Sequence, residues 1–473
     1  MTELTASLDS ATPAGSSVEG RTARISPRRA APASTQPSIA ILGLGYVGLP
    51  TALSARAGGA RTIGIDHSEG RLKAIRERRV DVIPDDHALL TRLLDDEDGF
   101  TLTSSLQAMS EADGVLICVP TPVDEHRDPD LRLLRAACAD AVRHARRGQT
   151  LILTSTSYPG TTRDLLALPL EARGFVVGED IFVASSPERI DPGNPMRHAE
   201  VPRIVGGVTP RCLAKATEIV RLVANDVVQV SSPEAAEMTK LLENSFRAVN
   251  IAFANEIATV CDTLGVDARE VIDAAATKPY GFMPFYPGTG VGGHCIPCDP
   301  HYLLWELRSR HAGAPILAEA MEAIAARPLM VVETIGSQLS ATGRGIAGAR
   351  VIIVGVAYKP GVEDARESPA VEIVNELRRR GATVDYHDPL VPSIHLDDQS
   401  IMLSVMRPEP DAYDVALVHA LHPGFEYGWL GGVDMVIDPG GRSGYGRGND
   451  APIERRMIAE SQAALSIGTS SDR

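Results

Sequence analysis

Short apolar runs recur along the first half of the chain, and each ends in glycine or in small polar residues. The first, SIAIL, begins at Ser38 and leads into a glycine-rich turn and a segment of helix length. Similar runs lie in GVLICVPTP, TLILTSTS and DIFVASSP, and amphipathic segments such as LRLLRAACADAVRHARRG separate them. Strands that alternate with helices predict parallel βαβ units and a doubly wound sheet.

The pattern changes after DVVQVSS. The next segment, PEAAEMTKLLENSFRAVNIAFANEIATVCDTLGV, has the character of one long helix. A second strand–turn–helix series opens with ARVIIVGVAYKP and continues in GATVDYHDP, AYDVALVHA and VDMVIDPGG. We therefore predict an α/β fold of two Rossmann-like doubly wound domains joined by a central helical region. The expected segments are a disordered tail at 1–36, domains at 37–231 and 331–455, the helical region at 232–330, and a second tail at 456–473.

Composition narrows the class of protein. The 473 residues exceed one compact core, and 44% hydrophobic with 23% charged residues is typical of a soluble globular protein. The net charge of −15 argues against nucleic acid as a partner, so an anionic ligand would need a locally basic pocket. The six cysteines form no disulfide framework, and no apolar run reaches the roughly 18 residues of a membrane span. We expect a cytoplasmic protein without a membrane partner.

Gly43, Gly45 and Gly48 form the spacing G-x-G-x-x-G directly after SIAIL and before a helical segment. In this pattern the first glycine permits a tight turn, the second admits a pyrophosphate to the backbone, and the third lets the helix pack on the strand. A plain glycine turn is the alternative, but the strand–turn–helix context favours a dinucleotide. Asp66 ends the next apolar run, where an acid accepts the ribose hydroxyls and repels a 2′-phosphate. The cofactor is therefore predicted to be NAD rather than NADP.

Two further places carry candidate chemistry. Lys240 and Asn244 lie at i and i+4 of the predicted long helix and share one face, where they can donate hydrogen bonds to an oxyanion. A solvated lysine and a surface asparagine are the plain alternative. Glu188 follows a predicted strand in SSPERIDPGN, at the edge where doubly wound sheets bind ligands, although a surface ion pair with Arg189 is equally ordinary.

A turn at residues 290–302, GVGGHCIPCDPHY, carries two cysteines. Its glycines Gly292 and Gly293 would bring the backbone close to a ligand and leave Cys295 accessible, and Asp299 before a proline is typical of a helix N-cap. The residues alone leave open unreactive packing, a redox CxxC, a nucleophile and a zinc site. The βαβ context of a thioredoxin-like CxxC is absent. A zinc site here would use His294, Cys295, Cys298 and His301 as ligands. These four lie within eight residues, more crowded than is usual for structural zinc sites, so we predict no metal.

Several segments, in order along the chain, resemble the UDP-glucose/GDP-mannose 6-dehydrogenase family. They are GLGYVGLP, ICVPTP, TSTSYPGTT, SPERIDPGN, MTKLLENSFRAVNIAFANE, YPGTGVGGHCIPCDPHYL and GVAYKPGVEDARESPA. The resemblance extends from about Ser38 to about Arg442. It implies oxidation of a nucleotide-sugar 6-hydroxyl to a carboxylate with two NAD, which binds to the first domain. It also implies that the nucleotide sugar binds to the second domain, and that the helical region forms a homodimer or a higher homo-oligomer.

The same resemblance implies roles for individual residues. Cys295 would add to the aldehyde intermediate as a thiohemiacetal and then become a thioester that water hydrolyses. Lys240 and Asn244 would stabilise the oxyanion, Glu188 would handle protons during thioester hydrolysis, and Thr156 and Asp299 would position or activate water. The implied cofactor contacts are Gly43, Gly45, Tyr46, Val47, Gly48, Asp66, Arg71, Pro120, Thr121, Thr156 and Arg366. The implied substrate contacts are Glu188, Arg189, Lys240, Asn244, Arg247, Lys278, Tyr286, Gly290, Gly292 and Lys359.

Some positions depart from the family pattern. Cys298 stands where relatives usually have an aliphatic residue, Thr154 stands where a glutamate is common, and the segment DPGGRS leaves Arg442 as a doubtful phosphate contact. The motifs TKPYGFMPFYPGTG and SPERIDPG favour UDP-N-acetylglucosamine as substrate, with UDP-N-acetylmannosamine and UDP-glucose as alternatives. A hypothesis of another class is an NAD-binding redox sensor that uses Cys295 and Cys298 as a switch.

Overall fold

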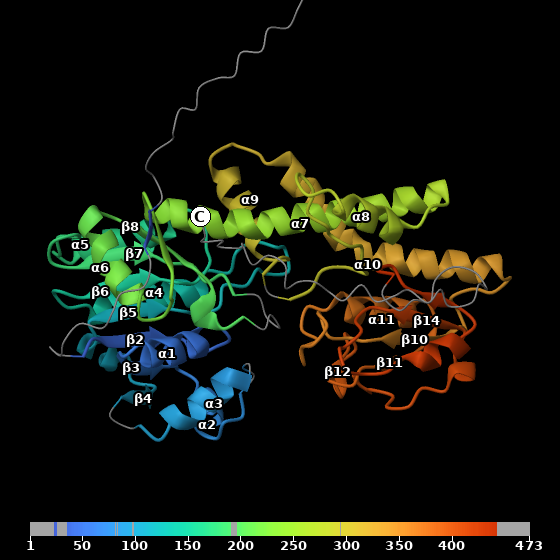
Figure 1. Ribbon diagram of the computed structural model, residues 1–473, viewed down its shortest axis with the longest axis horizontal. Coiled ribbons are helices and arrows are strands. Elements are labelled where there is room, and N and C mark those ends of the chain that lie inside the picture. Colours follow the sequence, from blue (N-terminus) through green and yellow to red (C-terminus); the bar gives the residue numbers. More distant parts are fainter. Residues whose placement is uncertain are drawn as a thin grey trace, which may run out of the picture.

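The computed structural model describes residues 23–25, 36–80, 82, 84–96, 99–190, 196–293 and 295–441. Figure 1 shows two α/β lobes side by side, with the long helix α7 (Pro233–Leu264) running along the first lobe and on toward the second. The predicted fold class, two Rossmann-like domains joined by helices, is confirmed. None of the described helices is long and apolar enough to cross a membrane.

The first lobe is built on a nine-stranded sheet in the order β1-β9-β8-β7-β6-β5-β2-β3-β4. β2 lies between β5 and β3, and all three run parallel, so the strand order reverses at β2. In an open α/β sheet, ligands bind at the carboxyl ends of the strands on each side of such a reversal. The strands are β1 (Ala23–Ile25), β2 (Ser38–Leu42), β3 (Arg61–Ile65), β4 (Phe100–Thr103), β5 (Gly114–Ile117), β6 (Thr150–Leu153), β7 (Phe182–Ser185), β8 (Arg203–Gly207) and β9 (Val227–Val230).

Helices cover both faces of this sheet because successive side chains of a strand point to opposite faces. Ile39 and Ile41 of β2 belong to one apolar core, and Ala40 and Leu42 belong to the other. The covering helices are α1 (Gly48–Ala57), α2 (Glu69–Arg76), α3 (Pro84–Leu93), α4 (Arg132–His144), α5 (Leu168–Ala172) and α6 (Pro210–Val220).

The helical region begins with α7, whose N-cap Ser232 accepts a hydrogen bond from the Ala235 N–H. α7 ends at Gly265, which adopts a left-handed conformation with φ of 71°. It packs along α10, and α9 lies beside it. α10 continues through residue 330, so the expected boundary at 330/331 falls inside a helix. The other helices of this region are α8 (Ala268–Ala276), α9 (Asp299–Ser309) and α10 (Pro315–Ala341).

The second lobe has a parallel four-stranded sheet in the order β11-β10-β14-β15. One face packs on α11 (Pro369–Arg379) and on the second half of α10. A hairpin of β12 (Ser393–His395) and β13 (Ile401–Leu403) lies outside the sheet. The sheet strands are β10 (Arg350–Val354), β11 (Thr383–His387), β14 (Val415–Val418) and β15 (Val436–Ile437).

The prediction of a disordered first tail is wrong at Ala23–Ile25, because these residues form β1 and pair with β9 as an antiparallel edge strand. Gln36 is also ordered and donates from its side chain to the Gly59 carbonyl oxygen. The rest of that tail, and the whole of 456–473, lies outside the described residues. The predicted strands also omitted β8, a short apolar run ending in glycine that is antiparallel to β7 and parallel to β9.

Candidate active site

The glycine turn after β2 has the geometry that a dinucleotide needs. Gly43 adopts φ of +89°, and a Cβ there would lie 2.7 Å from the Cys118 carbonyl oxygen. A Cβ at Gly48 would lie 1.7 Å from the Gly43 carbonyl oxygen, so this glycine lets α1 pack on the turn. A Cβ at Gly45 would meet nothing within 4 Å. The turn is thus tight on its protein side and open at Gly45, where the N-terminus of α1 can receive a pyrophosphate.

Asp66 follows β3 at the same sheet edge. Its carboxylate accepts hydrogen bonds from the Leu44 N–H and the Ser68 N–H, both at 2.9 Å. The side chain of Arg71 turns back and donates from Nε to the Leu44 carbonyl oxygen at 2.8 Å. The turn, Asp66 and Arg71 therefore form one hydrogen-bonded unit beside the open Gly45.

The other predicted cofactor residues come from two places, the sheet edge that carries the glycine turn and the second lobe. Pro120 and Thr121 follow β5, and Thr156 follows β6, so all three leave the same edge of the sheet as the glycine turn. Tyr46 and Val47 belong to the turn itself. Arg366 comes from the second lobe, where its guanidinium pairs with the carboxylate of Asp364.

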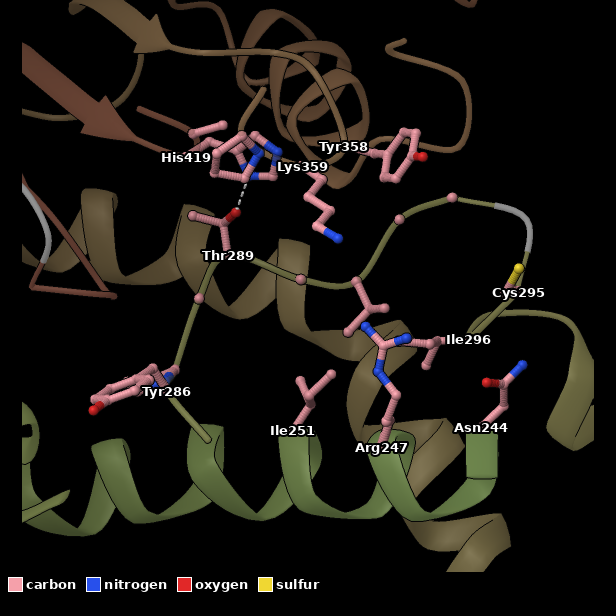
Figure 2. A pocket seen from close by; sticks show the side chains of 18 of the residues that line it. Asn244, Arg247, Ile251, Tyr286, Thr289, Cys295, Ile296, Tyr358, Lys359 and His419 are labelled. Atoms are coloured by element: carbon pink, nitrogen blue, oxygen red, sulfur yellow. Dashed lines mark hydrogen bonds between the residues drawn. The ribbon is translucent and has the colours of Figure 1, made fainter. Parts of the chain in front are cut away.

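A cavity of about 370 Å³ lies between α7, the loop at 286–296 and the second lobe. In Figure 2, α7 forms the floor with Asn244, Arg247 and Ile251, and the second lobe contributes Tyr358, Lys359 and His419 from above. The lining residues are Arg189, Ile190, Lys240, Glu243, Asn244, Arg247, Ile251, Tyr286, Pro287, Gly288, Thr289, Gly290, Val291, Gly292, Gly293, Cys295, Ile296, Tyr358, Lys359, Pro360, His419 and Ala420.

Cys295 reaches this cavity at the end where Asn244 lies (Figure 2), and Lys240, one helical turn before Asn244 on α7, also lines the cavity. Behind them the buried carboxylate of Asp299 accepts a short hydrogen bond from Asn244 Nδ2. The Asp299 N–H in turn donates to the Cys295 carbonyl oxygen at 2.8 Å. The prediction that Asp299 is an N-cap is wrong by one residue, because α9 begins at Asp299 and its carboxylate bonds to α7 instead.

Burial raises the pKa of Asp299 to about 6, although the charge of Lys240 and the hydrogen bond from Asn244 oppose this rise. A carboxyl group with such a pKa can exchange a proton near neutral pH, which suits a general base. The Lys240 cation thus comes from α7, the Cys295 thiol from the turn before α9, and the Asp299 carboxyl group from the first residue of α9.

Glu188 lies outside the cavity, in a buried ionic cluster. Its Oε2 forms an ion pair with Arg203 Nη1 at 2.5 Å and a hydrogen bond with His198 Nε2 at 2.7 Å. Its Oε1 accepts from the N–H groups of Arg189 and Ile190 at 2.7 and 2.9 Å. Burial alone would raise the pKa of Glu188, but the charges of Arg203 and His198 outweigh it and hold the pKa far below its ordinary value. Glu188 therefore stays ionised and fixes the backbone that carries Arg189.

Several cationic side chains line the cavity, as an anionic ligand requires in an acidic protein. Arg189 is held by a bidentate pair with Glu243, and Arg247 and Lys359 face each other across the cavity in Figure 2. Lys278 does not join them: this described residue lies exposed beyond α8, with its ammonium 5.1 Å from the ring centre of Tyr280. The expectation that Lys278 contacts substrate within its own subunit is not supported. Arg442 lies outside the described residues.

The loop that begins at Tyr286 is held from several sides. The Tyr286 hydroxyl donates to Asp273 of α8. The Gly288 N–H donates to Asn255 of α7, and its carbonyl oxygen accepts from Arg327 of α10, both at 2.9 Å. Sequence reasoning missed Asn255 and Arg327, because each acts on a backbone group far away in the chain and neither stands in a recognisable motif.

Further along, this loop passes close to the second lobe. A Cβ at Gly290 would lie 2.6 Å from Pro369 Cβ, and one at Gly292 would lie 2.5 Å from the Glu367 carbonyl oxygen. Both glycines are therefore needed for close packing of the loop.

The two cysteines of the CxxC segment face different spaces. Cys295 lines the cavity described above, whereas Cys298 and His301 line a second hollow beside α10 and α11. Burial raises the pKa of the Cys298 thiol to about 12. Among the residues that the structure describes, no three His, Cys, Asp or Glu side chains come together to hold a metal ion; His294 lies outside them. Cys298 does stand directly before α9, so one feature of a redox CxxC that the sequence appeared to lack is present.

A glycine turn suited to a dinucleotide, beside a cavity lined by a thiol and several cations, is the arrangement expected of an NAD-dependent dehydrogenase of an anionic substrate. Three domain profiles, all of one family, match the chain. They describe the NAD binding domain at 37–223, the central domain at 234–324 and the UDP binding domain at 352–438. The chain belongs to the UDP-glucose/GDP-mannose dehydrogenase family, and it is an NAD-dependent nucleotide-sugar dehydrogenase.

Individual relatives agree with this assignment. The chain is 33% identical over 392 residues to UDP-N-acetyl-D-glucosamine 6-dehydrogenase of Pseudomonas aeruginosa, covering 82% of this chain and 91% of that protein. It is 32% identical over 400 residues to UDP-N-acetyl-D-mannosamine dehydrogenase of Campylobacter jejuni, covering 82% and 96%. A solved UDP-D-ManNAc dehydrogenase of Pyrococcus horikoshii superposes with a TM-score of 0.77 at 30% identity, covering 85% of this chain and 95% of that one.

Proposed function

We propose that the chain oxidises the 6-hydroxyl of a UDP-N-acetylhexosamine to the carboxylate, with UDP-N-acetylglucosamine as the best candidate. The observation that carries this proposal is that Cys295 reaches the same cavity end as Lys240 and Asn244. A thiol is needed for oxidation beyond the aldehyde, because an aldehyde carbon gives up a hydride readily only after a nucleophile has added to it.

The order of side chains along the cavity supports a nucleotide sugar as ligand. Figure 2 has Cys295 at one end, Arg247 and Lys359 in the middle, and Tyr286 and His419 at the other end. This order matches a reacting sugar carbon, a diphosphate and a nucleoside. The cations would pair with the diphosphate, which is the part of the ligand that carries the negative charge.

Apolar side chains beside the reacting end favour an acetamido sugar over glucose. Ile296 lies between Arg247 and Cys295 in Figure 2, and Val291 also lines the cavity. They offer contact to an acetyl methyl group, which glucose lacks. The two relatives named above act on UDP-N-acetylhexosamines by name. UDP-N-acetylmannosamine and UDP-glucose remain the alternative substrates.

The residues of the glycine turn and Asp66 would hold NAD, which supplies a hydride acceptor for each of the two oxidations. In the first oxidation, Lys240 and Asn244 stabilise the negative charge that develops on the C6 oxygen. In the second, the Cys295 thiol adds to the aldehyde as a thiohemiacetal, and loss of a hydride and a proton leaves a thioester.

Hydrolysis then frees the enzyme. We assign Asp299 as the base that takes a proton from the attacking water, since burial raises its pKa to about 6. Thr156 is expected to position this water. Glu188 was expected to handle protons in this step, but its clamp by Arg203 and His198 favours a role as a permanently ionised anchor. Each sugar consumes one water and yields one carboxylate, two NADH and three protons.

We further propose a homodimer formed along α7. Five large apolar side chains, each at least 45% exposed, lie along this helix at spacings of four and seven residues. Such a stripe on one helix side is typical of a helix–helix interface; its members are Leu242, Phe246, Phe253, Val260 and Leu264. Analytical ultracentrifugation should find a dimer, and Phe253→Glu should shift it toward monomer.

A panel of UDP-sugars tests the proposed reaction. The purified protein is mixed with UDP-N-acetylglucosamine, UDP-N-acetylmannosamine or UDP-glucose and excess NAD, and NADH is followed at 340 nm, about the wavelength at which NADH but not NAD absorbs. We expect two NADH per sugar and the highest kcat/KM with UDP-N-acetylglucosamine. One NADH per sugar with a stable aldehyde product would refute the thioester route, and turnover of none of the three would refute the substrate class.

The redox-sensor hypothesis has weaker support. A sensor needs neither the buried Lys240 and Asp299 beside the thiol nor a cavity with several cations. Cys295 and Cys298 also line different hollows, so the thiols do not share one open space.

A further inference from the structure

One hydrogen-bonded side-chain pair joins the substrate loop to the second lobe. Thr289 follows the loop residues held by α7 and α10, and His419 follows β14 of the second sheet. The Thr289 hydroxyl and His419 Nδ1 make a short hydrogen bond, drawn in Figure 2. His419 Nε2 lies 2.9 Å from the Ala357 carbonyl oxygen, in the turn after β10. One imidazole thus connects three separate segments.

The bonds of His419 fix its tautomer. A carbonyl oxygen can only accept, so Nε2 must carry a hydrogen and donate it to Ala357. In the neutral ring Nδ1 then offers a lone pair, to which the Thr289 hydroxyl donates; the Ser368 hydroxyl also lies 3.5 Å from Nε2. Thr289 is 2% exposed, which means that its hydroxyl has no water to replace a lost partner. The geometry of the pair is therefore specified at both ring nitrogens.

The pair lies at the end of the cavity opposite Cys295. Thr289, His419 and Tyr286 surround that end in Figure 2, and Lys359 projects from the same turn as Ala357 toward the middle of the cavity. The distance between the loop and the second lobe at this point sets the width of the cavity end. A change there would alter the fit of the nucleoside and of the diphosphate beside Lys359, but would leave the thiol and Asp299 in place.

We propose that Thr289 and His419 are positioning residues that set the width of the nucleoside end of the substrate site. The proposal rests on the proposed function, since it takes the ligand to be a UDP-sugar. Loss of the pair weakens binding of UDP and of UDP-sugar alike, while the rate of the bound complex and the binding of NAD stay unchanged.

The test compares Thr289→Val with Thr289→Ser. Valine keeps the shape but leaves His419 Nδ1 without its donor, whereas serine keeps the hydroxyl. Titration calorimetry with UDP should give a Kd about tenfold higher for the valine variant and within about twofold of wild type for the serine variant. The KM for the UDP-sugar should follow the Kd, and kcat should stay within about twofold. A merely destabilised protein would instead lose kcat, NAD affinity and thermal stability together.

His419→Asn and His419→Gln sharpen the test. The Asn carbonyl can accept from Thr289, whereas the longer Gln amide can donate to Ala357, so each variant keeps one of the two bonds. In the double variant with Thr289→Val, the effect of His419→Gln should add little to that of the valine alone, because both break the contact between Thr289 and His419. Thr334→Val serves as control, since it removes a hydroxyl bonded to a helix carbonyl on the exposed side of α10 and should leave every constant unchanged.

Two outcomes would overturn the proposal: wild-type UDP affinity in Thr289→Val, or full additivity in the double variant. A wild-type protein that binds no UDP at all would instead refute the proposed function.

Discussion

The two Rossmann-like sheets use the same turn to different ends. In the first lobe the Gly43 N–H donates to the carbonyl oxygen of Ile65, and in the second the Gly355 N–H donates to that of His387, both at 2.8 Å. Both glycines adopt positive φ, and a Cβ at Gly355 would lie 1.9 Å from the Ala420 carbonyl oxygen. In each lobe an aspartate follows the next strand, β3 or β11, and accepts a backbone N–H of the turn.

The two aspartates differ in how much of the carboxylate is left open. Asp66 accepts two backbone hydrogen bonds and is 8% exposed. Asp388 is 1% exposed and accepts from the N–H groups of four residues and from His422 Nε2. Burial would raise the pKa of Asp388, but these bonds outweigh it and lower the pKa to about 2. The backbone donors are Val356, Ala357, Leu390 and Val391.

This difference explains how one fold serves two ligands. The Asp66 carboxylate of the first sheet accepts fewer hydrogen bonds than Asp388 and so keeps acceptor capacity for the ribose hydroxyls expected there. In the second lobe the Asp388 carboxylate is fully occupied by hydrogen bonds to protein groups. The loops after the strands of this sheet place Lys359 and His419 at the cavity instead. The glycine turn alone therefore does not identify a dinucleotide site; the free capacity of the acid after the next strand does.

The largest expected effect is on turnover: a substitution at Cys295 should lower kcat while the binding of NAD and of UDP is retained. Cys295→Ser should lower kcat roughly a thousandfold or more, at least about 4 kcal/mol in barrier, because a serine hydroxyl is far less ionised than a thiol near neutral pH. Calorimetric titration should find NAD and UDP affinities near those of wild type. Retained turnover would refute covalent catalysis. Loss of UDP binding would indicate that Cys295 holds the conformation of the loop rather than taking part in the reaction.

Asp388→Asn tests the structural role of the second aspartate. The introduced amide group would point donors at the N–H groups of Val356 and Ala357, so we expect a loss of about 3 kcal/mol in the free energy of unfolding. Wild type should lose a similar contribution as the pH falls from about 4 to about 2, since the pKa of Asp388 is depressed only in the folded state. Denaturant unfolding at several pH values measures both. The matched variant Asp66→Asn should lower the free energy of unfolding by at most about 1 kcal/mol. Equal losses in the two variants would refute the difference between Asp66 and Asp388.

The sequence predicted those parts of the protein that depend on neighbouring residues. The strand–turn–helix units, the glycine turn and the shared face of Lys240 and Asn244 follow from local spacing, and the structure agrees in each case. The helical region was harder to delimit. A proline usually disrupts a helix interior, yet α10 continues through Pro328 and across the expected boundary.

The missed features depend on contacts between distant segments. Asp299 was taken for a cap because the sequence cannot reveal that Asn244 bonds its carboxylate. The clamp on Glu188 joins it to His198 and Arg203, and neither stands in a motif. Thr289 and His419 lie 130 positions apart. No period or short motif can report such a pair, because only the packing of the lobes brings it together.

A third aspartate, Asp299, lies between the two lobes and should differ from both in its titration. Its pKa is raised to about 6, so the protonated fraction grows as the pH falls through this value and the base is lost. We expect kcat/KM to fall about tenfold per pH unit below about pH 6. Asn244→Ala removes a hydrogen bond that lowers this pKa, and the acid limb of its residual activity should move to higher pH. An acid limb near pH 4 in the wild type would exclude Asp299 as the base.

The smallest expected effect concerns the choice of cofactor by the first sheet. The carboxylate of Asp66 would repel the 2′-phosphate of NADP, so kcat/KM should favour NAD by at least roughly tenfold, about 1.4 kcal/mol. Asp66→Asn should narrow this ratio chiefly by improving the use of NADP. Equal kcat/KM for both cofactors in the wild type would show that Asp66, like Asp388, serves only the turn that it closes.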